Sequence, residues 1–286
     1  MNKRSQILQS KKVLERRRKK RILTYSIFSV AGISVIVAFV LLFRAPFLRI
    51  SKVVVEGAVT IDKTEVEERT HETLAGVYLG VFPKAGTLFL SKAKIKEMVL
   101  ESFKEVEKVA VSRKGLSGLA IKIEERKPSV LVCPGFHEKD VLETEEKCFF
   151  ADDEGYVFAP APEFSSGVYV RYYIRSDEGV DPVGKNFVDT GRFKEFQAFV
   201  KSLTLRGISV LGMLVGEDGM YELYIKNRDL SEAIIYFDDR SSLEKTSSNL
   251  TAFWDSAQNK KLGTSTTPIF EYINLRFGNN IFYVLK

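Results

Sequence analysis

The sequence predicts an α+β protein with a single transmembrane helix, a β-α-α-β-β domain, and a mixed, strand-rich domain with two helices. Three observations support this class. An uncharged apolar run follows a basic N-terminal stretch, two segments of helical periodicity follow a short β-branched run, and later segments are short and apolar between turn residues. The expected divisions are a basic tail over 1–21, a membrane helix over 22–43, a first external domain over 44–128 and a second over 129–286.

The net charge of +6 is concentrated at one end of the chain. Residues 1–21 hold ten Lys or Arg residues and a single Glu, for a net charge of +9. The remaining residues hold 33 basic and 36 acidic side chains, for a net charge of −3. A mildly acidic body offers no broad basic face for a nucleic-acid backbone, so nucleic-acid binding is not expected.

The apolar run over 22–43 has the length of a membrane-spanning helix. At about 1.5 Å per residue it covers roughly 33 Å, close to a hydrocarbon core of about 30 Å. The run continues directly into Arg44-Ala45-Pro46-Phe47 without a small-residue cleavage site, which distinguishes it from a removed signal peptide. The positive-inside rule then places residues 1–21 in the cytoplasm and the residues after Pro46 outside.

The first external domain begins with a β-branched strand over 52–56. A helix is expected after the capping pair Asp62 and Glu65, and a second helix after Ser91. Alternating residues on either side of a turn over 114–118 predict a hairpin. The inward positions expected for the two helices are Val66, Thr70, Leu74 and Val77, then Ile95, Met98, Val99, Phe103 and Val106.

This hairpin reads V-x-R, turn, L-x-I-x-I-x-E-R-x-P, and it resembles the POTRA domain of the FtsQ/DivIB family of bacterial cell-division proteins. The segment Val54–Gly57 likewise resembles the family's V-x-G exit from the first strand. Gly115-Leu116 stands where the family often has Trp-Pro. The residues that carry the hairpin pattern are Val111, Arg113, Leu119, Ile121, Ile123, Glu125, Arg126 and Pro128.

The second external domain is expected to be rich in strands. Strands are predicted over 149–150, 156–158, 168–174, 208–215, 221–225, 233–237, 269–275 and 281–285, with helices over 189–205 and 241–258. The order resembles the β-domain of the same family. The segment after Ala151 matches D-x-x-G-x-V-F, and Tyr272–Phe277 reads Y-I-N-L-R-F, close to the family's terminal Y-I-D-L-R-Y with Asn274 in place of the Asp.

Catalytic chemistry is not expected, and no catalytic, cofactor-binding or metal-binding residue is assigned. Both histidines have ordinary interpretations, His71 on the polar face of a helix and His137 in a polar loop. Common nucleophile, zinc-protease and phosphate-loop motifs are absent from the sequence. The acidic pairs Asp152-Asp153 and Asp238-Asp239 are interpreted as solvated turn residues.

Cys133 and Cys148 are the only cysteines, and the predicted topology places both outside the cytoplasm, where disulfides persist. The polar stretch between them could join two neighbouring strands and bring the thiols together. Two unpaired thiols are the alternative. Zinc is disfavoured by the spacing and by the shortage of nearby histidines.

The family resemblance implies a scaffold of the division machinery at the septum of the bacterial cytoplasmic membrane. It implies binding to FtsB and FtsL, and through them recruitment and regulation of septal peptidoglycan synthesis by FtsW–FtsI. The alternatives are a POTRA-bearing protein of envelope assembly or secretion, and a membrane-anchored envelope enzyme.

Two surfaces are candidates for these contacts. A closing strand could accept a partner strand along its open edge, unless the edge is covered by its own chain. The edge candidates, which the resemblance associates with FtsB, are Arg276, Phe277, Ile281, Phe282 and Tyr283. The candidates on the first external domain, which the resemblance associates with recruitment and with FtsK, are Val53, Val54, Val55 and Gly57.

Overall fold

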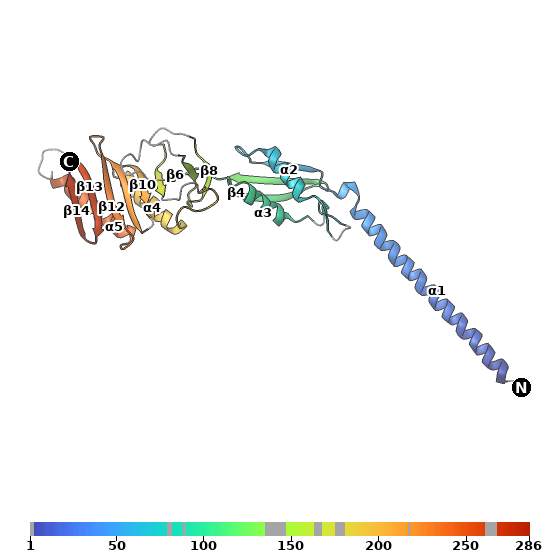
Figure 1. The fold of residues 1–286 in the computed structure, drawn as a ribbon. Coiled ribbons are helices and arrows are strands. Elements are labelled where there is room, and N and C mark those ends of the chain that lie inside the picture. The colour runs from blue at the N-terminus through green and yellow to red at the C-terminus, as the bar shows by residue number, and fades with distance from the viewer. Residues whose placement is uncertain are drawn as a thin grey trace. The chain divides into compact units, whose positions relative to one another are not determined.

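The protein is a mixed α/β structure in which an apolar helix precedes a small sheet and a larger, strand-rich sheet (Figure 1). The computed structural model describes residues 3–78, 82–87, 90–134, 147–162, 168–174, 181–216, 218–260 and 268–286. His137 lies outside the described residues. The chain divides into two compact units, Met1–Glu124 and Glu125–Lys286, which we call unit 1 and unit 2.

Unit 1 begins with helix α1, Lys3–Phe43, which includes most of the basic segment as well as the apolar run. The short 3-10 helix η1, Pro46–Leu48, follows it. Within the described residues, one helical segment, Val13–Leu42, is long and apolar enough to cross a membrane, and none of it is buried against the rest of the protein.

The sheet of unit 1 has the order β1-β5-β4. Its strands are β1 (Lys52–Glu56), β4 (Val106–Lys114) and β5 (Gly118–Glu125), and β1 runs parallel to β5. Helices α2 (Lys63–Thr73) and α3 (Lys92–Ser102) pack on this sheet and on each other. Their first turns are capped by Asp62 and Ser91, whose side chains accept hydrogen bonds from backbone N–H groups.

The helix boundaries correct the expected helical assignment of Val77 and Val106. Val77 is not on a helix, because α2 ends before Gly76, whose φ of +91° is unsuited to a helix interior. Val77 instead belongs to β2 (Val77–Tyr78), which pairs with β3 (Phe82–Pro83) in a hairpin that the periodicity did not predict. Val106 is likewise outside the helix, as the first residue of β4, but it is buried in the core of unit 1 as predicted.

Unit 2 is built on a nine-stranded sheet with the order β14-β13-β12-β11-β10-β9-β6-β7-β8. Its pairs β6–β9, β9–β10 and β12–β13 are parallel. The strands are β6 (Val130–Pro134), β7 (Phe149–Ala151), β8 (Val157–Pro160), β9 (Arg171–Ile174), β10 (Ser209–Val215), β11 (Met220–Lys226), β12 (Glu232–Asp238), β13 (Phe270–Phe277) and β14 (Asn280–Leu285).

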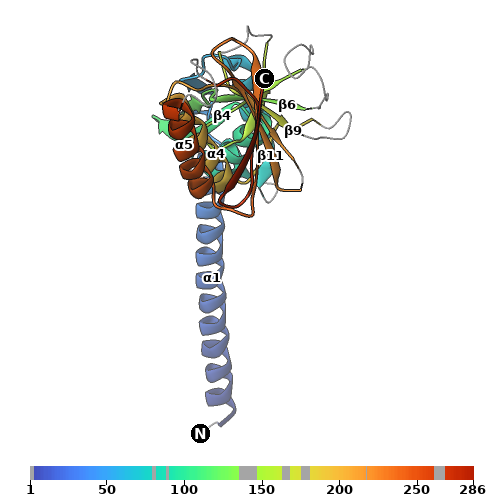
Figure 2. The same ribbon diagram turned by 90° about the vertical axis from the view of Figure 1, so that its left-hand side faces the viewer.

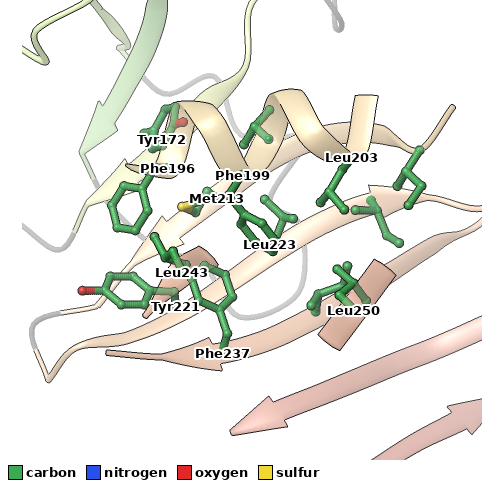
Figure 3. Close-up of a cluster of buried hydrophobic side chains, with 14 of the residues drawn as sticks. Tyr172, Phe196, Phe199, Leu203, Met213, Tyr221, Leu223, Phe237, Leu243 and Leu250 are labelled. Atoms are coloured by element: carbon green, nitrogen blue, oxygen red, sulfur yellow. The ribbon is translucent and has the colours of Figure 1, made fainter. Parts of the chain in front are cut away.

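Helices α4 (Thr190–Thr204) and α5 (Leu243–Lys260) lie side by side in unit 2 (Figure 2). Figure 3 shows aromatic and aliphatic side chains of α4 packed over the strands, and these residues form the main core of the unit. Phe196, Leu203, Leu223 and Ile235 are fully buried there. Replacing such a residue with Ala typically costs about 2–5 kcal/mol, so this packing fixes the sheet that carries the site below.

Two acidic residues expected to be solvated are buried. Asp152 accepts hydrogen bonds from the backbone N–H groups of Glu154 and Tyr156, and its other oxygen binds Arg126. Asp238 is buried at the end of β12 and binds Arg240. The solvated interpretation is wrong for these two residues, because the basic partners and backbone donors satisfy their carboxylates within the fold.

Candidate functional site

The candidate site lies on strands β13 and β14 at one end of the sheet of unit 2. Strand β13 is paired on both sides, in parallel with β12 and antiparallel with β14. Among the described residues, no strand pairs with the outer side of β14. The backbone groups on that side are therefore unused by the sheet in this part of the chain.

One backbone hydrogen bond shows which N–H groups of β14 face outward. The N–H of Lys286 donates to the carbonyl oxygen of Ile269 at 3.0 Å, so it faces β13. Successive N–H groups of an antiparallel strand alternate between its two sides, and residues 282–285 follow each other without a bulge on β14. The N–H groups of Tyr283 and Leu285 therefore face the open edge.

Phe277 and Phe282 form an exposed aromatic pair beside this edge. Their side chains are 54 % and 55 % exposed, and their ring centroids are 5.0 Å apart in an edge-to-face arrangement. The pair is an adjoining apolar surface that a partner could cover, and aromatic side chains bury large areas when they are covered.

The other two apolar candidates on β14 contribute to the fold. The ring of Tyr283 lies 5.1 Å from that of Phe253 on α5 and 5.9 Å from that of Phe270. Ile281 is partly buried and packs against the main core of unit 2. The apolar candidates thus divide: Ile281 and Tyr283 pack against the core and α5, although Tyr283 is still 36 % exposed, while Phe277 and Phe282 are more than half exposed.

Arg276 is held in place by three neighbours. Its Nε donates to Oδ1 of Asn274 at 3.1 Å, and its guanidinium lies 5.2 Å from the ring centroid of Tyr236. Its backbone carbonyl accepts from Nη2 of Arg240 at 3.0 Å. Asn274, in the position where the resembling motif has Asp, therefore orients Arg276 without neutralising it, and the half-buried guanidinium keeps its positive charge at the surface.

A pocket of about 470 Å³ adjoins Arg276 and Phe277. Sequence reasoning missed the other side chains around it, because they come from the ends of β11 and β12 and from the turns beside those strands. The residues that line the pocket are Asp218, Met220, Asp238, Asp239, Arg240, Arg276 and Phe277. Its walls combine both charge signs with the apolar surfaces of Met220 and Phe277.

A row of tyrosines also escaped the sequence reasoning. Tyr236 and Tyr272 are edge-to-face neighbours on β12 and β13, with centroids 5.9 Å apart. Tyr173 and Tyr224 belong to a second buried cluster, separate from the core under the helices. Tyr224 donates a hydrogen bond to Glu222 at 2.7 Å, and burial raises its pKa well above the usual tyrosine value. The alternation of side chains along 220–226 and 232–238 could have shown that Tyr224 and Tyr236 lie on the face of the sheet opposite the main core.

The same cluster contains a disulfide between Cys133 and Cys148. Cys133 lies in β6, and Cys148 comes directly before β7, the antiparallel neighbour of β6. The bond closes the excursion between these two strands. Its role here is structural, since Cys133 is fully buried.

The structure changes the candidate surface on unit 1. Val53 and Val55 are buried in the core of unit 1, so a partner could contact their side chains only by opening that core. Val54 points to the opposite face of β1 and is 38 % exposed. Gly57 has a φ of +85°, and a Cβ there would lie 2.2 Å from the carbonyl oxygen of Ile123, which accounts for the glycine by close backbone packing.

Metal-binding side chains do not gather in the described residues. No cluster of three or more His, Cys, Asp or Glu side chains is arranged to hold a metal ion there. His71 is exposed in the last turn of α2. Comparison of the chain with models of protein families and with curated proteins found no match. The site is therefore interpreted from its own geometry.

Proposed function

We propose that this chain is a non-enzymatic, single-pass membrane scaffold of the bacterial division machinery, with α1 as its anchor and the open edge of β14 as its main partner site. The motifs quoted above that resemble FtsQ/DivIB proteins supply the biological role. In this proposal the part of unit 1 that follows α1 is a POTRA domain, unit 2 is the family's β-domain, and both lie outside the cytoplasm.

The observation that carries the proposal is the unpaired outer side of β14 beside the exposed rings of Phe277 and Phe282. An added strand would accept hydrogen bonds from the outward N–H groups of Tyr283 and Leu285. Main-chain pairing of this kind provides affinity, and side chains on alternate residues provide specificity. The phenyl pair offers an apolar anchor, and Arg276 offers a positive charge that selects an acidic or polar partner residue.

The resemblance identifies the partner as FtsB, which would act with FtsL and link the scaffold indirectly to FtsW–FtsI. Unit 1 would contribute recruitment and an FtsK contact through the exposed face of β1 at Val54. The order of elements supports this role better than a secretion or assembly role, because the described residues contain the strands and helices proposed to form a POTRA domain once and not as a series.

The cellular test is the position of a fluorescent fusion to the intact chain. A division scaffold should form a band at midcell that appears before constriction. Signal spread evenly along the cell periphery would contradict a division role and would leave the assembly or secretion alternative. A chain with Phe277→Ala and Phe282→Ala provides the comparison, since it should still reach the membrane while losing its edge-dependent partner.

A further inference from the structure

The positive charge of unit 1 outside α1 is segregated at one end of the unit. Three segments form this end, 44–52, 82–87 and 113–118, and we call them the basic end. They contain no acidic residue and six basic ones, Arg44, Arg49, Lys52, Lys84, Arg113 and Lys114. The rest of 44–124 holds eight Lys or Arg and eleven Asp or Glu residues, for a net charge of −3.

Backbone hydrogen bonds hold the three segments together. Ile50 donates to the carbonyl oxygen of Ala85 at 2.9 Å, and Ser51 donates to that of Ser117 at 2.9 Å. Thr87 is buried between the other two segments: its backbone N–H donates to the carbonyl oxygen of Leu48 at 2.8 Å, and its hydroxyl donates to that of Leu116 at 2.5 Å. The basic residues are therefore brought to one end by the fold, although they are far apart in the sequence.

Two exposed apolar side chains belong to the same end. Phe47 in η1 is 54 % exposed, and Leu116 at the tip of the turn between β4 and β5 is 63 % exposed. Basic residues around exposed aromatic and aliphatic side chains are typical of protein surfaces that lie on anionic membranes.

The short connection to α1 places the basic end close to any membrane that α1 crosses. Phe47 lies four residues after the end of α1 at Phe43, and four residues span at most about 14 Å. Leu48 is in turn hydrogen-bonded to the segment that contacts the turn at Leu116. If α1 crosses a membrane, the basic end is tethered within reach of the headgroup layer of that membrane.

We propose that the basic end is a lipid-binding surface, which holds unit 1 against the anionic headgroups beside its own anchor. The lysine and arginine side chains meet lipid phosphates, and Phe47 and Leu116 enter the headgroup region. Contact at this end limits how far the sheet of unit 1 can tilt relative to the membrane. This inference requires that α1 spans a membrane and does not depend on the division role.

The test measures membrane contact at Leu116 in the full chain. The only tryptophan of the sequence is first removed by Trp254→Phe. A single new tryptophan is then introduced by Leu116→Trp. The protein is reconstituted in vesicles of equal parts phosphatidylcholine and phosphatidylglycerol with acyl chains brominated near the headgroup. Val59→Trp is the matched control, because Val59 is 88 % exposed and follows the opposite end of β1.

We expect bromine to quench Leu116→Trp emission several-fold more strongly than Val59→Trp emission. Quenching should fall in pure phosphatidylcholine and with Arg113→Glu/Lys114→Glu, since each basic residue near an anionic surface changes partitioning about fivefold. Lys63→Glu/Lys108→Glu, an exposed pair in the half of the unit that contains Val59, should leave quenching unchanged.

Equal quenching at the two tryptophan positions would overturn the proposal, as would quenching at Leu116→Trp that is insensitive to the Arg113 and Lys114 reversals. A melting curve for each protein shows whether it remains folded. If the reversed pair melts early, Arg113→Gln/Lys114→Gln removes the charge without repulsion and should still reduce quenching. A uniform cellular distribution of the protein, which contradicts the division role, would not change any of these expectations.

Discussion

Arg126 binds the carboxylate of Asp152 through Nη1 while its guanidinium lies 4.1 Å from the ring centroid of Tyr156. Both charged side chains are largely buried, at 16 % and 6 % exposure. Arg126→Ala would leave the carboxylate of Asp152 buried without its cation, and the expected loss is about 3 kcal/mol in the free energy of unfolding. Denaturant unfolding of residues 44–286 measures it.

Lys108→Ala is the matched control for this loss. Lys108 pairs with Glu107 in an exposed salt bridge that water screens, so its removal should cost much less than the removal of Arg126. Similar losses for the two variants would show that the Arg126 pair is no more important than a surface pair.

The FtsB edge is tested by variants that separate the open side of β14 from its folded side. Phe277→Ala should weaken binding of FtsB to residues 44–286 by about 1–3 kcal/mol, because it removes an exposed anchor. Arg276→Glu should also weaken binding, since it reverses the charge beside that anchor. Pull-down with purified FtsB, with a melting curve for each variant, provides the measurement.

Proline substitutions on β14 distinguish the two sides of the strand. Tyr283→Pro removes an outward N–H and should block partner pairing. Val284→Pro removes an inward N–H and should lower the melting temperature by breaking the ladder with β13. Tyr283→Pro also removes the tyrosine ring that packs against Phe253. Leu285→Pro, which removes the next outward N–H, therefore provides the cleaner comparison. Undiminished FtsB binding in all of the folded edge variants would place the interface elsewhere.

Removal of the disulfide should destabilise unit 2. Cys133 and Cys148 are 15 positions apart, and closing a loop of this size restricts the unfolded chain by about 3 kcal/mol in the chain-entropy account. Cys133→Ser/Cys148→Ser should lower the denaturation midpoint accordingly. Alkylation followed by mass measurement should detect no thiol before reduction and two after it; reactive thiols in the oxidised protein would contradict the bond.

Alkaline pH should destabilise unit 2 through its buried tyrosines. Burial raises the pKa of Tyr172 well above its ordinary value of 10.0. Above that value the unfolded chain loses the phenolic proton while the folded chain keeps it, so the free energy of unfolding falls as pH rises. Tyr172→Phe should reduce this slope by up to about 1.4 kcal/mol per pH unit, as measured by denaturant unfolding across the alkaline range. An unchanged slope would show that Tyr172 does not contribute.

The membrane orientation is tested with a reporter that fluoresces only in the cytoplasm. The basic side chains before α1's apolar run favour an N-terminus inside. The reporter should therefore fluoresce when it is fused before Met1 and remain dark when it is fused after Lys286. The reverse pattern would contradict the orientation and, with it, the extracytoplasmic assignment of unit 2 and of the part of unit 1 that follows α1.

Local sequence patterns predicted where the helices and strands lie, but they did not predict which residues are buried or which strands pair. The apolar run, the helix after Asp189 and the strands that form β11 and β12 could be located because periodicity and capping depend on residues close in sequence. The burial of Asp152 could not be predicted, since its partner Arg126 is 26 positions away. The parallel pairing of β9 with both β6 and β10 likewise depends on contacts between distant segments.

The candidate site shows the same limit. Its strand and its aromatic residues were readable from the sequence, and alternation places Phe282 and Tyr283 on opposite faces of that strand. It could not show which of the two faces is covered by α5. The pocket beside Arg276 combines residues from three parts of the chain. Only the folded sheet brings Asp218 and Arg240 to the same place.

The contact between Tyr283 and Phe253 has a consequence for the dynamics of unit 2. An edge strand with one paired side normally opens more easily than the centre of a sheet, and its amide hydrogens exchange sooner. Because the ring of Tyr283 rests on α5, fraying of β14 removes support from that helix as well. A strand bound at the edge should therefore slow amide exchange both in β14 and along the Phe253 face of α5, so that the helix reports occupancy of a surface it does not touch.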